Sequence, residues 1–159
     1  MSKKKDMQRL IRAYKDETGE TEIDMHDVVR FAVSKGWPLP VPKSPMDLLA
    51  KQFTDAASEE IEHDPKTGRP FRVYHAVPVQ KGQLKLFHYI DIREAPRKPM
   101  LKSLVNRREQ MVGDGLQLTF DALYWNSIHP DEEPIVLPMD LTLDIEWRIN
   151  APDDGEDAA

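Results

Sequence analysis

The sequence has no cysteine, seven glycines and no long hydrophobic run. Without cysteine the chain forms no disulfides, thiolate zinc sites or iron–sulfur clusters, and it has no thiol nucleophile. No stretch approaches the roughly 20 apolar residues of a membrane span, and no apolar run follows the charged start Met-Ser-Lys-Lys-Lys-Asp. We therefore expect a cytoplasmic protein with no signal peptide and no membrane partner.

Motifs for common catalytic chemistry are also missing. The sequence has no phosphate-binding loop, no dinucleotide fingerprint and no Gly-x-Ser-x-Gly. Its five histidines show no His-x-x-x-His spacing, and two of them, His75 and His88, lie in segments that we expect to be paired strands. Two imidazoles do not close a metal site, so we expect core histidines there. The sequence predicts a protein that is not an enzyme and holds neither metal nor cofactor.

Charge is distributed unevenly along the 159 residues. Residues 1–108 hold 21 basic and 15 acidic residues, whereas residues 109–159 hold one basic residue, Arg148, and 13 acidic ones. A basic region followed by an acidic end favours a polyanion-binding surface with a tail that competes for it. The alternative is that the acidic residues only solvate a surface and a disordered end.

Hydrophobic spacing predicts three helices in the first 60 residues. Apolar residues recur at helical spacing in residues 4–16, before Thr18-Gly19, and in a second helix capped by Asp24 and stopped by Gly36. A stiff connector with four prolines follows, from Trp37 to Pro45. Ser44-Pro45 then has the pattern of a helix start, and this third helix is expected to run to about residue 60.

The remaining chain predicts a hairpin, a long helix and an extended end. Residues 71–77 and 84–92 alternate in polarity on either side of a short segment that contains Lys81-Gly82, which is typical of a β-hairpin. A helical pattern then runs from about residue 100 to 125, where Gly113 and Gly115 indicate a kink or a close contact. Residues 126–149 should form a short strand or an extended segment packed on the domain, and residues 150–159 a disordered acidic tail.

We therefore expect a mainly helical α+β protein with one domain in residues 1–125. Three helices followed by a hairpin resemble, in element order, a winged helix, a DNA-binding variant of the helix-turn-helix. The connector before the third helix is longer than the three or four residues of a tight helix-turn-helix. The resemblance implies nucleic-acid binding, to DNA more than RNA, by basic residues of the first helix, the third helix and the hairpin region: Arg9, Arg12, Lys15, Lys43, Lys51, Arg69, Arg72, Lys81 and Lys85.

The alternative is an adaptor subunit of a larger complex that makes no nucleic-acid contact. Large aromatic residues often anchor protein interfaces, and the chain has four outside an obvious core: Trp37, Tyr124, Trp125 and Trp147. On this interpretation the long C-terminal helix would bind a protein partner or a second copy. The other possibility for these aromatics is that they close the core of the chain itself.

Overall fold

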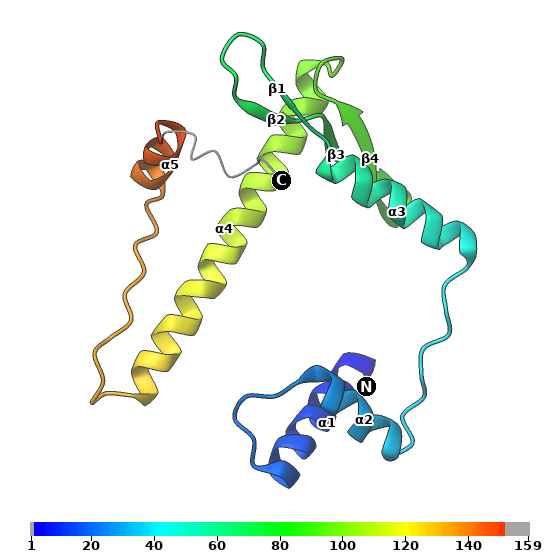
Figure 1. The fold of residues 1–159 in the computed structure, drawn as a ribbon, viewed down its shortest axis with the longest axis vertical. Helices are drawn as coiled ribbons and strands as arrows, with labels where there is room; N and C mark the ends of the chain where they lie inside the picture. Colours follow the sequence, from blue (N-terminus) through cyan, green and yellow to red (C-terminus); the bar gives the residue numbers. More distant parts are fainter. Residues whose placement is uncertain (1, 152–159) are drawn as a thin grey trace, which may run out of the picture. The chain divides into compact units, whose positions relative to one another are not determined.

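The computed structural model describes residues 2–151 and is an α+β structure (Figure 1). Its described part contains five helices and two small antiparallel hairpins, as expected for a mainly helical α+β chain. The elements in chain order are α1 (Lys3–Thr18), α2 (Met25–Ser34), α3 (Pro45–Glu59), β1 (Ile61–His63), β2 (Pro70–Arg72), β3 (Tyr74–Lys81), β4 (Leu84–Asp91), α4 (Arg97–Ile128) and α5 (Thr142–Ile149).

The chain divides into two compact units, Met1–Gln52 and Phe53–Ala159, which we call the N-terminal and C-terminal units. The division falls within α3, so α1 and α2 belong to one unit and both hairpins to the other. A winged helix instead packs its three helices and its hairpin around one core. The winged-helix arrangement therefore stays a prediction.

The N-terminal unit is a pair of packed helices whose ends lie where the sequence predicts them. Asp24 caps α2 by accepting a hydrogen bond from the His26 N–H at 2.8 Å, and Gly19 ends α1 with a φ of 71°. The Tyr14 ring meets the Phe31 ring edge-on, with the centroids 5.6 Å apart. The Tyr14 hydroxyl donates to Glu20 at 2.7 Å, and this hydrogen bond is the main cause that raises the pKa of Tyr14 to about 12.

The predicted hairpin forms as β3 and β4, joined by Gly82-Gln83. Gly82 has a φ of 61°, which a two-residue hairpin loop needs and which glycine adopts without strain. The register pairs Val77 with His88 and His75 with Ile90, so the two histidines are not opposite each other. His75 is buried and hydrogen-bonded to the Arg72 carbonyl, as expected of a core histidine, whereas His88 is exposed.

A second hairpin, β1–β2, was not predicted by the sequence. Its strands have three residues each, too short for polarity to alternate visibly, although the turn between them, at Asp64–Gly68, is recognisable. Backbone hydrogen bonds from Val73 to Glu60 and from Ile92 to Val73 join the two hairpins. Val73 is completely buried at this junction.

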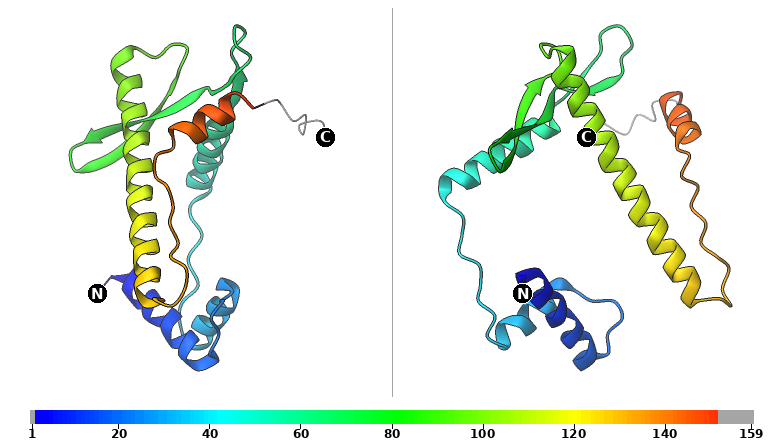
Figure 2. Two further views of the ribbon diagram at one scale, coloured as in Figure 1. Left: turned by 90° about the vertical axis from the view of Figure 1, so that its left-hand side faces the viewer. Right: turned by 180° about the vertical axis from the view of Figure 1, so that it is seen from behind.

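Helix α4 is longer than predicted and carries the β3–β4 hairpin across its first turns (Figure 2). Pro96 precedes the helix and Pro99 lies in its first turn, where no backbone N–H is required, so neither proline delays the start to residue 100. Ser103 is fully buried and donates to the Ala76 carbonyl at 2.6 Å. Lys102 donates to the Pro78 carbonyl, also at 2.6 Å, so two successive residues of α4 hold β3.

The strand or extended conformation expected around Leu141 is wrong for residues 142–149, which form α5. The alternation that favoured a strand also places Leu143 and Trp147, and Ile145 and Ile149, at i, i+4 positions of a helix. Asp140 accepts from the Thr142 N–H at 3.1 Å at the start of α5, and this hydrogen bond lowers the pKa of Asp140. The extended part is residues 133–141, and residues 152–159 of the predicted acidic tail lie outside the described chain.

Candidate interaction surfaces

The second half of α4 exposes a line of large apolar side chains beside the exposed polar side chains of Gln117 and Asp121. Phe120, Tyr124 and Ile128 are four residues apart and form one stripe, which we call the α4 stripe. Their exposed fractions are 54%, 67% and 53%. Large apolar side chains that are aligned and exposed on one helix frequently mark an interaction site. The α4 stripe therefore has the character of a contact surface.

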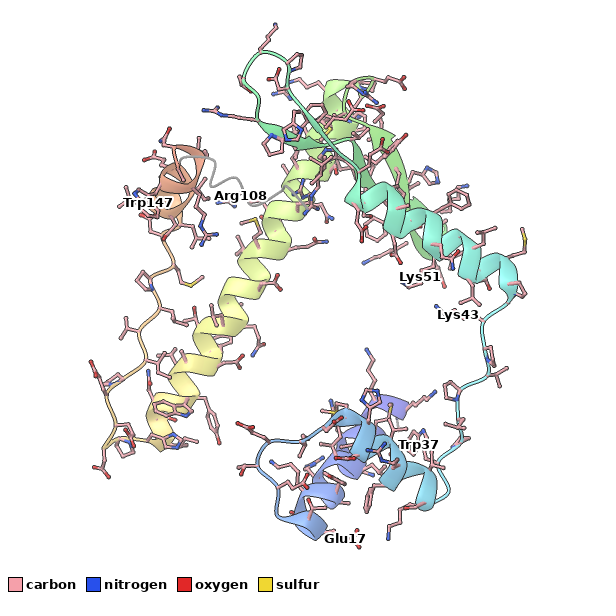
Figure 3. The ribbon with its side chains drawn as sticks, in the orientation of Figure 1. Glu17, Trp37, Lys43, Lys51, Arg108 and Trp147 are labelled. Atoms are coloured by element: carbon pink, nitrogen blue, oxygen red, sulfur yellow. The ribbon has the colours of Figure 1, made fainter. Side chains whose placement is uncertain are left out.

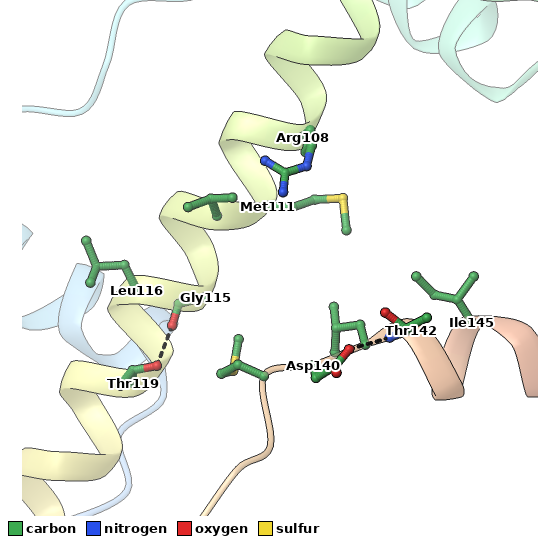
Figure 4. A pocket seen from close by; sticks show the side chains of 11 residues that line it. Arg108, Met111, Gly115, Leu116, Thr119, Asp140, Thr142 and Ile145 are labelled. Carbon is green, nitrogen blue, oxygen red and sulfur yellow. Dashed lines mark hydrogen bonds between the residues drawn. The ribbon is translucent and has the colours of Figure 1, made fainter.

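The opposite side of α4 forms one wall of a groove, and residues 139–145 form the other wall (Figure 4). The groove has a volume of about 620 Å³. Its α4 wall includes Met111, Gly115 and Thr119, and Arg108 lies at one end. A side chain at position 115 would bring its Cβ within 2.8 Å of the terminal methyl of Met139, so glycine is what lets Met139 approach the helix. The glycines of α4 were expected to mark a kink or a close contact, and the contact is found at Gly115, whereas a Cβ at Gly113 would meet open space.

Helix α5 presents one apolar face inward and another outward. Ile145 lines the groove beside α4, and Ile149 faces the β1–β2 turn near Pro70. Leu143 and Trp147 lie on the other side and are 76% and 80% exposed. Figure 3 shows Trp147 on the side of α5 away from α4.

The four aromatics predicted for a partner interface have different environments. Tyr124 and Trp147 are exposed, as an interface residue must be. Trp125 is half-buried and stacks on the His129 ring, with the centroids 4.2 Å apart and an angle of 19° between the planes. Trp37 is half-buried in the N-terminal unit, where it lines an apolar groove between α1 and α2.

One cluster of charged groups fixes the junction of the two hairpins. Arg93 donates to Asp91 at 2.8 Å and to Glu62 at 2.8 Å, which ties β1 to the end of β4. The hydrogen bonds from Arg93 lower the pKa of Asp91, and the same pairing raises the pKa of Arg93. Arg93 pairs with carboxylates of both hairpins, Glu62 and Asp91, so this cluster holds the two hairpins together.

The predicted nucleic-acid-binding residues do not form one surface in the C-terminal unit. Arg69 and Arg72 belong to the β1–β2 hairpin, whereas Lys81 and Lys85 lie at the tip of β3–β4. Lys81 lies nine positions after Arg72, which corresponds to roughly 30 Å of extended chain. All four side chains are exposed.

The other five predicted residues belong to the N-terminal unit: Arg9, Arg12, Lys15, Lys43 and Lys51. The first three lie on the exposed surface of α1, where Arg9 is 3.7 Å from Asp6. Lys43 is in the connector and Lys51 on α3 (Figure 3). Arg9, Arg12 and Lys15, which all lie on α1, are the largest set among the nine that shares one element.

The described residues show neither a metal centre nor a membrane-spanning helix. No group of three or more His, Asp or Glu side chains in residues 2–151 is arranged to hold a metal ion. Among the described helices, none combines the length and the apolar character that crossing a bilayer would require.

Phe120 and Ile128 were missed as interface candidates by the sequence analysis. The signal was present, because these residues extend the i, i+4 spacing of Tyr124 in both directions. What the sequence alone cannot show is which side of α4 the returning chain covers. Residues 139–145, which we call the strap, pack on the opposite side of α4 and leave the α4 stripe exposed.

Comparisons with known proteins give no match. No protein-family model, no curated protein and no solved structure is significantly similar to the chain.

Proposed function

We propose that the protein is an interaction subunit that binds another protein chain through the α4 stripe. The observation that carries the proposal is the exposure of Phe120, Tyr124 and Ile128, which align along α4 and are each more than half exposed. Aromatic side chains bury large areas at interfaces and frequently contribute most of the binding energy. A single aligned stripe on a 32-residue helix offers the i, i+4, i+8 anchors of helix-mediated recognition.

The small core supports the same function. Of the large apolar residues among the described ones, four are buried: Tyr14, Val28, Val73 and Val77. A chain of this length that works alone usually buries a much larger core. A subunit of an assembly instead completes its core with side chains of its partner, as obligate interfaces resemble the interior of a domain.

A photo-crosslinking experiment in cells tests this proposal. A photoreactive phenylalanine analogue replaces Tyr124 in the full chain, and the same analogue replaces Gln83 at the β3–β4 tip as the control. We expect discrete adducts from position 124 whose partner peptide is identified by mass spectrometry. The adducts should disappear when Phe120 and Ile128 are changed to Ser in the same chain.

The comparison of the two positions decides the result. If position 124 forms no adduct, or gives the same heterogeneous adducts as position 83, the α4 stripe is not an interface. Circular dichroism of the Ser variant checks that α4 remains helical, as expected when both substituted residues are more than half exposed.

We also propose, as a second function, that α1 binds a polyanion such as duplex DNA. Lys5, Arg9 and Arg12 recur at i, i+4, i+7 and lie on the side of α1 opposite the buried Tyr14. Basic side chains on one exposed helical face neutralise phosphates and release counterions. The long connector before α3 makes α3 a weaker candidate for this contact. The separation of the hairpin lysines from Arg72 makes the two hairpins weaker candidates as well.

A salt titration tests the second function. Lys5→Glu, Arg9→Glu and Arg12→Glu together should weaken binding to duplex DNA and reduce the log–log salt slope by about 0.9 for each lost phosphate contact. The matched control is Lys81→Glu with Lys85→Glu at the hairpin tip. An unchanged slope in the α1 variant, with the helix content retained, excludes α1 as the binding surface.

A further inference from the structure

The N-terminal unit contains an apolar groove that its own side chains do not fill. The groove has a volume of about 420 Å³ and runs between α1 and α2 to Trp37 and the prolines after it. Leu10 and the buried Val28 lie at its base. Polar atoms contribute little to its lining, and Lys3 is the charged residue among those that line it.

One wall of the groove is a regular stripe on α2. Met25, Val29 and Val33 are four residues apart and are 55%, 51% and 44% exposed. Within this unit Tyr14 and Val28 are the buried large apolar residues among those described. Two helices bury only the strip where they touch, so a second layer is required to remove the other apolar positions from water.

The charges beside the groove indicate what supplies that layer. The start of α1 is basic on balance, with three lysines (Lys3, Lys4 and Lys5) against Asp6, and the region where α1 ends is acidic on balance, with Asp16, Glu17, Glu20 and Glu22 against Lys15. The 16 residues of α1 separate these two ends by about 24 Å. The unit is therefore self-complementary in charge when two copies lie antiparallel.

We propose that the groove is filled by the same groove of a second copy, with the two α1–α2 pairs antiparallel about a two-fold axis. In such an isologous contact the same two surfaces face each other, so every contact occurs twice. The basic end of each α1 therefore lies beside the acidic end of the other α1. The three α2 residues of each copy interdigitate in a four-helix layer, with Val29 closest to the axis because it is central in the stripe. This surface differs from the α4 stripe, and neither proposal depends on the other.

Cysteine crosslinking of the full chain tests the contact directly, because the natural sequence has no cysteine to compete. Val29→Cys is compared with Arg12→Cys, which is exposed on the outer side of α1. With a short bis-maleimide, Val29→Cys should form a covalent dimer at least about tenfold faster than Arg12→Cys, since bridging requires the two thiols to be close. Adding Val33→Glu to the Val29→Cys chain should abolish the difference.

Charge exchange distinguishes a second copy from any other occupant. In the Val29→Cys background, one variant carries Lys3→Glu, Lys4→Glu and Lys5→Glu, and another carries Asp16→Lys, Glu17→Lys and Glu22→Lys. Each variant alone should lose the rapid crosslink because both of its ends have the same sign. A mixture of the two should regain it as a mixed dimer, which mass spectrometry identifies.

Three results would overturn the proposal. One is equal crosslinking at positions 29 and 12. Another is a mixture that crosslinks no faster than its components. The third is a Val29→Cys adduct that maps to a residue outside the α1–α2 pair, because a different segment would then occupy the groove.

Discussion

The side-chain amide of Asn126 binds both backbone polar groups of Ile135. Its Nδ2 donates to the Ile135 carbonyl at 2.9 Å, and its Oδ1 accepts from the Ile135 N–H at 2.8 Å. This paired contact reverses the chain after α4 and directs residues 136–141 back along the helix (Figure 2). One amide at the end of α4 thereby determines which side of the helix the strap covers.

Replacing Asn126 should release the strap. Asn126→Ala removes both hydrogen bonds and should lower the free energy of unfolding by about 1 kcal/mol, the usual net contribution of partly exposed hydrogen bonds. Hydrogen exchange should rise selectively in residues 135–145, while α4 residues near Ser103 keep their protection. Ser127→Ala is the control, since the Ser127 hydroxyl bonds only to the Tyr124 carbonyl one turn back. Unchanged exchange in residues 135–145 would show that the strap is held by other contacts.

The two glycines of α4 should respond differently to alanine. Gly113 has open space where a Cβ would lie, so Gly113→Ala should stabilise the protein by about 0.5–1 kcal/mol through the better helix propensity of alanine. At Gly115 the new Cβ lies 2.8 Å from the Met139 methyl, which must move, so the gain should be smaller. Chemical denaturation measures both. Met139→Ala combined with Gly115→Ala should remove the clash, and equal gains for the two single variants would contradict the contact.

Acid should loosen the junction of the two hairpins through Asp91. The hydrogen bonds from Arg93 lower the pKa of Asp91, so its stabilising effect is complete above the ordinary carboxyl pKa of about 4 and is lost as the pH falls through the lowered value. Asp91→Asn should reduce the pH dependence of the unfolding midpoint in this acidic range. Glu94→Gln, at an exposed neighbouring carboxylate, is the control. If the Asp91 and Glu94 variants show the same pH dependence, Asp91 is not the group that responds.

Local signals in the sequence were sufficient for most of the secondary structure. Asp24, Gly19 and Ser44 mark helix ends by hydrogen bonds or φ values that involve neighbouring residues only, and the β3–β4 hairpin follows from alternation around a glycine turn. The β1–β2 hairpin was missed because its strands are too short to show a period. Residues 142–149 were misread because the same apolar positions fit a strand and a short helix.

The sequence by itself determined helices α1 to α4, the main hairpin and the apolar spacing along α4, because these depend on residues a few positions apart. Only the tertiary structure decided which apolar residues are covered. Ser103 packs against β3, Met139 lies on Gly115 and Asn126 holds Ile135, and each of these contacts joins segments that no local period relates. Those distant contacts place the strap on the other side of α4, and Phe120, Tyr124 and Ile128 are therefore left exposed. For this reason the candidate interface could be identified only from the tertiary structure.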